Sequence, residues 1–321
     1  MYICRGTVTS ERIEQPCLVL VGPTAIGKTD LSLTVARRYG CEIVSVDSMQ
    51  VYRYMDIGTA KASCDERAEV PHHLIDIVDP DEPYDSARFA EDGLQAIRRI
   101  HSRGKVPLLT GGTGLYLKAL LEGIFPGVPV DEEVRQMLRV RLVAEGALKL
   151  HEELSLCDRV SATRIHMNDT QRLLRALEVF YVTGIPWSEH IRRHKKETEG
   201  LLLANTLQVG LTTDRAELYQ RINSRCDMML EAGLEEEVRK LLAMGYDRTL
   251  NALGSIGYRH MINYIDGQWT LEETVRLLAR DTRRYAKRQY TWFSNMPDLQ
   301  WFDVNEQQNV LHAVDAWFAK L

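Results

Sequence analysis

The sequence lacks the features that would place it in a membrane or in the secretory pathway. Its apolar runs are short: residues 17–21 and 42–46 are typical, and a membrane-spanning helix needs about 20. Residues 1–16 lack the apolar middle region of a secretory signal. We therefore expect a cytoplasmic protein that has no association with a membrane.

Cysteine pairs and an excess of positive charge are also missing. The six cysteines are scattered without a C-x-x-C pair, which argues against both a zinc site and a disulfide framework. The net charge of −5 argues against a protein that coats nucleic acid over its whole surface. It leaves room for a local basic surface.

A phosphate-binding loop is the strongest motif that is present. Residues 22–29, GPTAIGKT, have the full G-x-x-x-x-G-K-[ST] spacing. Such a loop turns backbone N–H groups towards phosphates, adds a lysine charge and offers a hydroxyl to Mg²⁺. The loop recognises phosphate only, so the rest of the ligand must be identified elsewhere in the chain.

Short apolar strands alternate with helical patterns along the chain. The pattern predicts strands at 17–21, 42–46, 106–110 and 207–211, with a helix over 28–38 directly after the loop. We predict an α/β fold, namely a P-loop-containing parallel sheet flanked by helices, with a helical insertion domain.

The helical insertion divides the predicted core. Residues 17–122 and 204–303 are expected to form one discontinuous P-loop domain, residues 123–203 the insertion, and residues 1–16 an N-terminal arm that is loosely held.

Polar residues follow three of the predicted strands. They are the loop itself, Asp47-Ser48-Met49-Gln50, and Gly111-Gly112-Thr113. Ligands of parallel sheets bind at the carboxyl ends of the strands, so these segments are predicted to form one site. From this pattern alone, Asp47 is a general base, a group linked to a metal ion, or a helix N-cap.

Basic residues cluster on the predicted helix 271–293. Arg276, Arg280, Arg284 and Lys287 or Arg288 fall on one stripe, and between Arg276 and Arg288 only Asp281 opposes their charge. The stripe is either an ordinary solvated face or a surface for an anion. Arg164, Arg172 and Arg175 leave the same two interpretations open.

Seven segments together resemble tRNA dimethylallyltransferases, also called isopentenyl-diphosphate:tRNA transferases, of the bacterial type. The resemblance spans about residues 17–303, and its motifs match in order as well as in content. The segments are GPTAIGKT (22–29), SVDSMQVYRYMDIGTAK (45–61), PHHLID (71–76), GGTGLY (111–116), RIHMNDTQRLLRALEV (164–179), GSIGYRH (254–260) and TRRYAKRQYTWF (282–293).

The resemblance implies transfer of a dimethylallyl group from dimethylallyl diphosphate to N6 of the adenosine immediately 3′ of the anticodon in tRNA. It implies that Asp47, Thr113 and Lys28 are catalytic, that Thr29 binds Mg²⁺, and that Arg221 or Arg225 lies near the diphosphate. The diphosphate-binding loop would comprise Gly22, Pro23, Thr24, Ala25, Ile26, Gly27, Lys28 and Thr29.

The resemblance also implies contacts with the anticodon stem-loop, and we expect the enzyme to act as a monomer. Met167, Thr170 and Ile26 depart from the residues common in the family. The implied tRNA-binding residues are Asp47, Ser48, Met49, Gln50, Thr113, Arg135, Gln171, Arg172, Leu173, Leu174 and Arg175, joined by Arg284 and Arg288 of the basic helix.

Two rival hypotheses use the same residues. An ATP-dependent small-molecule kinase would use the loop and Asp47 as a phosphate cradle and a metal or substrate group. A non-catalytic RNA-binding protein would retain the loop without using it. The intact Lys28-Thr29 pair argues against the second rival, and the basic helices argue against the first.

Overall fold

A computed structural model describes residues 12–123, 131–197 and 203–321, and for residues 194–197 the backbone only. By its contacts the chain divides into two compact units. An α/β unit comprises residues 12–121 and 203–321, and a helical unit contains the described part of 122–202. Residues 1–11 of the expected arm lie outside the described residues. Ile13 is buried and forms a β-bridge with Leu203, so the end of the expected arm belongs to the α/β unit.

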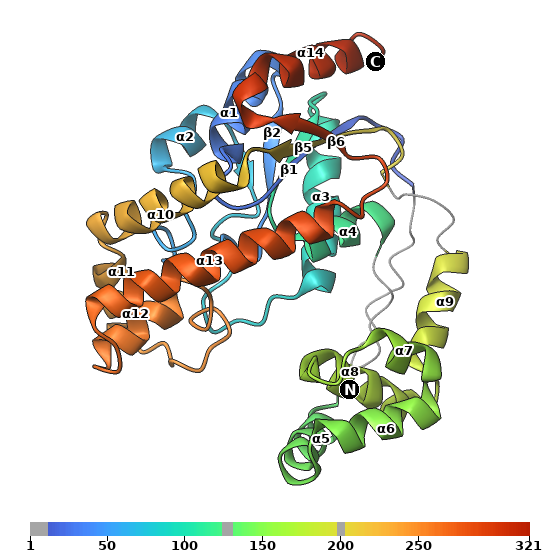
Figure 1. Cartoon of the computed structure of the whole chain (residues 1–321). Helices are drawn as coiled ribbons and strands as arrows, with labels where there is room; N and C mark the ends of the chain where they lie inside the picture. The colour runs from blue at the N-terminus through green and yellow to red at the C-terminus, as the bar shows by residue number, and fades with distance from the viewer. Residues whose placement is uncertain (1–11, 124–130, 198–202) are drawn as a thin grey trace. The chain divides into compact units, whose positions relative to one another are not determined.

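The α/β unit is built on a six-stranded sheet in the order β3-β2-β4-β1-β5-β6, in which every neighbouring pair is parallel (Figure 1). The predicted parallel sheet is therefore confirmed, with two short strands added, one at each edge. The strands are β1 (Cys17–Val21), β2 (Glu42–Val46), β3 (His72–His73), β4 (Pro107–Gly111), β5 (Thr206–Thr212) and β6 (Gln300–Asp303).

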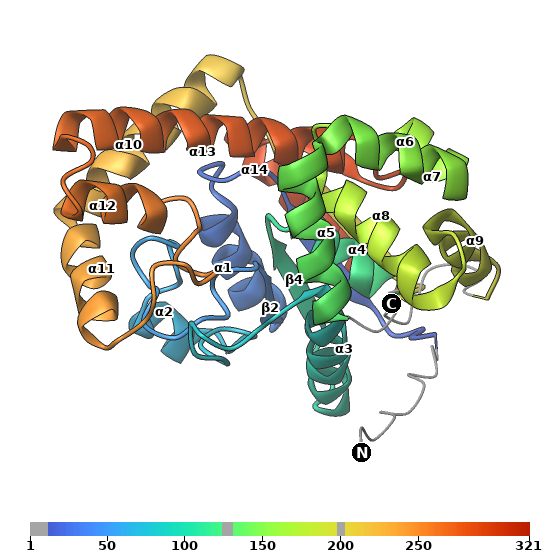
Figure 2. The ribbon, with the colours of Figure 1, turned by 90° about the horizontal axis from the view of Figure 1, so that it is seen from below.

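Helices cover this sheet and extend from one end of it. Helix α1 packs against β1, β2 and β4, and α14 packs against β5 and β6. Helices α10 to α13 form a connected group beside the sheet (Figure 2). The helices of this unit are α1 (Lys28–Tyr39), α2 (Cys64–Glu69), α3 (Ser86–Ser102), α4 (Gly114–Glu122), α10 (Arg215–Glu231), α11 (Leu234–Ala243), α12 (Tyr258–Ile265), α13 (Leu271–Phe293) and α14 (Gln307–Phe318), with a 3₁₀ turn at Val304–Glu306.

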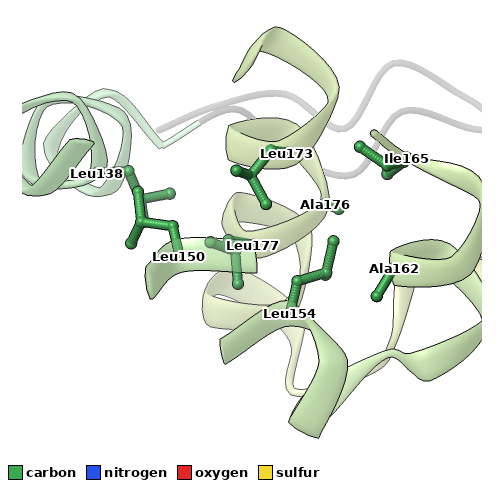
Figure 3. Packing of buried hydrophobic residues seen from close by; sticks show 8 residues of the cluster. All are labelled: Leu138, Leu150, Leu154, Ala162, Ile165, Leu173, Ala176 and Leu177. Carbon is green, nitrogen blue, oxygen red and sulfur yellow. The ribbon is translucent and has the colours of Figure 1, made fainter. Parts of the chain in front are cut away.

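The helical unit has its own apolar core. Leu173 and Leu177 of α8 face Leu138, Leu150 and Leu154 from the neighbouring helices (Figure 3). Each of these leucines is fully buried, which is the burial that a separately packed unit requires. Its helices are α5 (Glu132–Glu145), α6 (Ala147–Cys157), α7 (Arg159–Arg164), α8 (Thr170–Thr183) and α9 (Trp187–Glu197).

Candidate active site

The strand register brings the three polar segments together. Val21 at the end of β1 is level with Gly111 of β4, and Gly111 is level with Val46 of β2. The next residues along the chain, Gly22, Gly112 and Asp47, therefore leave the sheet at the same edge. The topology also reverses here, since the chain moves from β1 towards one side of the sheet and from β4 towards the other.

The backbone of the phosphate-binding loop has the shape that an anion site needs. Ala25 has a φ of 63° and Gly27 a φ of 102°, so two left-handed residues turn the loop before α1 begins at Lys28. Gly27 caps α1 without a side-chain hydrogen bond, which leaves the first N–H groups of that helix for a ligand.

Lys28 is held under this loop by neutral oxygen atoms. Its Nζ donates to the carbonyl oxygens of Gly22 at 3.0 Å and Pro23 at 2.8 Å. Burial and the nearby Arg225 guanidinium lower the pKa of Lys28 to about 7, against the attraction of Asp47. A bound diphosphate would supply the negative charge that favours the ammonium form.

Both candidate arginines on α10 reach the loop. Arg221 donates to the Ile26 carbonyl at 3.2 Å and forms an ion pair with Glu217 at 2.6 Å. Arg225 donates to the Thr24 hydroxyl at 3.3 Å, and burial lowers the pKa of its guanidinium. The two side chains flank the loop at different points, so both are placed to meet an anion there.

Asp47 caps a turn, and no helix begins at this residue. Its Oδ1 accepts hydrogen bonds from the backbone N–H groups of Met49 at 2.8 Å and Gln50 at 3.2 Å. The next described helix, α2, begins only at Cys64, so the helix N-cap interpretation is wrong. The turn orients the carboxylate and commits only Oδ1 to the backbone.

Thr113 joins the Asp47 segment to the glycine-rich segment. Its backbone N–H donates to the Val46 carbonyl at 3.1 Å, and its hydroxyl accepts from the Ser48 N–H at 3.0 Å. Gln50 is held inside the protein as well, because its amide oxygen accepts from Ser45 at 2.8 Å and its amide nitrogen faces the carbonyls of residues 59 and 60.

The phosphate loop, Asp47, Gln50 and both arginines of α10 line one cavity of about 670 Å³ within the α/β unit, whereas Ser48, Met49 and Thr113 are not among its lining residues. That volume lies within the range of about 300–1,000 Å³ that is common for small-molecule sites. Its polar lining includes loop residues 24–30, Asp47, Gln50, Gly111, Gly112, Arg221, Arg225, Tyr285 and Gln289. Three predicted groups of residues that are far apart in the sequence thus share one cavity.

Thr29 also lines the cavity, at the first turn of α1. Among the described residues no three His, Cys, Asp or Glu side chains gather as they would in an all-protein metal site. A hydroxyl beside a phosphate loop suits Mg²⁺, which usually takes few protein ligands and completes its shell with phosphate oxygens and water. The two adjacent histidines have different partners: His73 contacts Glu42 at 2.7 Å, whereas His72 contacts the Val70 carbonyl at 2.7 Å and lines the cavity.

The other implied tRNA-binding residues lie on three helices. Arg135 is on α5, residues 171–175 are in the first turns of α8, and Arg284 and Arg288 are exposed on α13. The implied RNA contact of Leu173 is wrong, because its side chain is fully buried in the core of the helical unit and cannot contact RNA. Gln171 and Arg172 are exposed, while Leu174 and Arg175 are half-buried.

The three implied RNA-binding arginines of the helical unit are paired with carboxylates. Arg135 and Arg175 both contact the buried Glu178 at 2.9 Å, and Arg172 contacts Asp169 at 3.5 Å. More of the positive charge on the α13 stripe is balanced than expected, since Arg276 pairs with Glu273, which precedes the stripe. The Asp281 carboxylate contacts Arg280 and Arg284 of α13. It also contacts two side chains of α12, Arg259 and His260.

Comparison with known proteins decides the family. The model of the IPP transferase family matches residues 50–296, and the isopentenyl transferase model matches residues 16–76. The chain belongs to the IPP transferase family. It is 56% identical to the tRNA dimethylallyltransferase of Desulfotalea psychrophila over 96% of this chain and 97% of that protein.

Solved structures of the family agree. The tRNA isopentenylpyrophosphate transferase from Bacillus halodurans is 40% identical, with a TM-score of 0.69 over 96% of this chain and 98% of that chain. A eukaryotic dimethylallyltransferase acting on tRNA is 29% identical, with a TM-score of 0.81 over 96% of this chain and 80% of that one. No described helix is long and apolar enough to cross a bilayer.

Two residues that hold segments of the site in place were not predicted from the sequence. Gln289 of α13 reaches both the phosphate loop and Gly112, with hydrogen bonds of 2.8 and 2.9 Å. Glu237 of α11 accepts three consecutive backbone N–H groups, those of residues 56–58, and the Tyr258 hydroxyl. A single polar residue on a helix produces no periodic signal in the sequence. The two motifs that Glu237 connects, MDIGTAK and GSIGYRH, were nevertheless recognised in the sequence.

Proposed function

We propose that this chain transfers the dimethylallyl group of dimethylallyl diphosphate to N6 of the adenosine immediately 3′ of the anticodon in tRNA. The observation that carries the proposal is that the phosphate loop and Asp47 follow β1 and β2, the two strands on either side of β4, and line one cavity. Membership of the IPP transferase family and the activity for which its relatives are named support the choice of substrates.

In the proposed reaction, the N6 lone pair forms a bond to C1 of the donor, and the C1–O bond breaks. The electron pair of that bond leaves on the diphosphate, and the N6 proton passes to Asp47. The lone pair of an adenine amino group is delocalised into the ring, so a base that removes the proton as the bond forms assists the step. Oδ2 of Asp47 is the oxygen proposed to take the proton, because Oδ1 accepts two backbone N–H groups.

The phosphate loop has the complementary task of stabilising the leaving group. Lys28, Arg221, Arg225 and the N–H groups at the start of α1 are the proposed donors to the diphosphate, and their charge opposes the charge that develops as C1–O breaks. Thr29 would hold Mg²⁺, which would supply further positive charge to the diphosphate oxygens.

The target adenine must leave the anticodon-loop stack to be modified, at a cost of a few kcal/mol. Ser48, Met49, Gln50 and Thr113 are the proposed contacts near the base, because they surround Asp47. Arg135, Gln171, Arg172, Arg175, Arg284 and Arg288 are the proposed contacts to the RNA elsewhere. These are partly exposed side chains with donors suited to phosphate oxygens.

One comparison tests the function against its rivals. The chain is incubated with tRNA, Mg²⁺ and either dimethylallyl diphosphate or ATP, and the tRNA nucleosides are analysed by mass spectrometry. We expect an adenosine that gains one dimethylallyl group with the allylic donor alone. ATP consumption without nucleoside modification would favour the kinase, and tRNA binding without any reaction would favour the non-catalytic protein.

A further inference from the structure

A buried glutamine connects the two loops between which the proposed reaction takes place. Gln289 lies on α13 and is 5% exposed. Its Oε1 accepts the backbone N–H of Thr24 in the phosphate loop at 2.8 Å, and its Nε2 donates to the Gly112 carbonyl at 2.9 Å. We infer that Gln289 is a positioning residue that fixes the donor loop against the glycine-rich loop that carries Thr113.

The glycine-rich loop is shaped to receive α13. A Cβ atom on Gly112 would lie 2.1 Å from Nε2 of Gln289, and one on Gly114 would lie 2.1 Å from the Trp292 ring. Neither position can carry a side chain unless the Gln289 or Trp292 side chain moves. Residues 112 and 114 are therefore glycines because Gln289 and Trp292 occupy the space, and α13 is a wall of the site as well as a basic surface.

A second contact of α13 lies one turn earlier on the same helix. The Tyr285 phenol lies beside the side chains of Thr113 and Gln289, and burial raises its pKa to about 12. Tyr285 therefore stays protonated at neutral pH. Together, Tyr285 and Gln289 connect Thr24, Gly112 and Thr113, so the helix contacts both the leaving-group side and the base side of the cavity.

The two hydrogen bonds of Gln289 need a side chain of this length that accepts at one end and donates at the other. One end of the group must accept from Thr24 and the other must donate to Gly112. An ionised carboxylate in its place would lose the donor and add a negative charge beside the diphosphate. A protonated carboxyl can accept and donate, so it can replace the amide. This difference predicts a pH dependence that a general loss of packing would not produce.

The test rests on the proposed function and uses single-turnover transfer to tRNA with saturating donor. For Gln289→Leu we expect a loss of about 10²-fold in rate, the size associated with small misplacement of reacting groups. Donor affinity is expected to change by about tenfold or less, which one neutral hydrogen bond accounts for. Thr274→Val is the matched control, because Thr274 is a fully buried residue of α13 outside the cavity lining.

The decisive variant is Gln289→Glu. Its single-turnover rate is divided by the rate of the unaltered chain at each pH. The ratio cancels the pH effects that both proteins share. We expect the ratio to rise as the pH falls and the introduced carboxyl becomes protonated, while the ratio for Gln289→Leu stays flat. A flat ratio for Gln289→Glu, or equal losses of transfer rate in Gln289→Leu and Thr274→Val, would overturn this inference but not the proposed function. Absence of transfer by the unaltered chain would overturn the proposed function as well.

Discussion

Two of the cations at the cavity, Lys28 and Arg225, are held in the opposite way to two arginines of the helical unit. In the described part of the chain, Lys28 and Arg225 contact neutral oxygen atoms and form no ion pair. Arg135 and Arg175, by contrast, share the buried carboxylate of Glu178. A partly buried cation without a counter-ion favours a bound anion, whereas a paired arginine offers only its remaining N–H donors.

This difference assigns different tasks to the two regions. The cavity concentrates positive charge where the diphosphate is proposed to leave, and it depresses the pKa of Lys28 until an anion arrives. The helical unit presents arginines at fixed positions with much of their charge already balanced. We therefore expect the cavity to control the rate of transfer, and the paired arginines and the stripe on α13 to control the affinity and position of the RNA.

The largest predicted effect tests the cavity side. Asp47→Asn keeps the oxygen that accepts the Met49 and Gln50 N–H groups but cannot take the N6 proton. We expect single-turnover transfer to fall by roughly 10²–10⁴, with little change in RNA binding or in the melting temperature. Near-normal transfer by this variant would show that Asp47 is not the base. Asp47→Ala is a useful companion, since it removes the turn-capping oxygen too.

A second prediction separates packing from RNA contact in the helical unit. Leu173→Ala is expected to lower the free energy of unfolding by about 2–5 kcal/mol, because it opens a cavity among fully buried leucines. Chemical denaturation measures this loss. Arg172→Ala is the neighbouring control, and it should cost little stability but weaken RNA binding. Weakened RNA binding by a still-folded Leu173→Ala protein would restore Leu173 to the set of RNA contacts.

A third prediction follows from the pKa of about 7 at Lys28. Above pH 7 the free protein holds Lys28 largely neutral, and a diphosphate favours the ammonium, so binding takes up a proton. Donor affinity should then fall by up to about tenfold for each pH unit between pH 7.5 and 9. Calorimetry in buffers of different ionisation enthalpy measures the proton uptake. The Lys28→Met variant should bind more weakly and lose this pH dependence, and an equal slope in both proteins would contradict the assignment.

The sequence predicted the parts of the fold that repeat a pattern. The strands that end at the site are continuous apolar runs, and helix 271–293 was predicted with the bounds that the structure has. The edge strands β3 and β6 were missed because one has two residues and the other has no buried residue. Leu173 was misassigned for the opposite reason: a family motif marks a segment but does not say which of its side chains face the core.

The cavity was harder to predict than the loops that form it. Gln289 stands among the three arginines and one lysine of TRRYAKRQYTWF, and its single amide has no periodicity that would mark it as buried. Its importance appears only when Thr24 and Gly112 are brought to it by the sheet. Contacts between three distant segments depend on tertiary packing, which local pattern does not encode.

The smallest predicted effect tests the stripe on α13. If RNA binding involves about six phosphate contacts, raising the salt concentration from roughly 50 to 200 mM should lower affinity on the order of 10³-fold. Arg284→Ala removes one exposed cation, so the slope of log affinity against log salt should fall by about one, which is about fourfold over that range. Arg276→Ala is the matched control, since Glu273 holds Arg276 in a close ion pair while Arg284 lies 3.6 Å from a shared Asp281. An unchanged slope for Arg284→Ala, with a changed slope for Arg276→Ala, would move the RNA contact to the other end of the helix and away from the cavity.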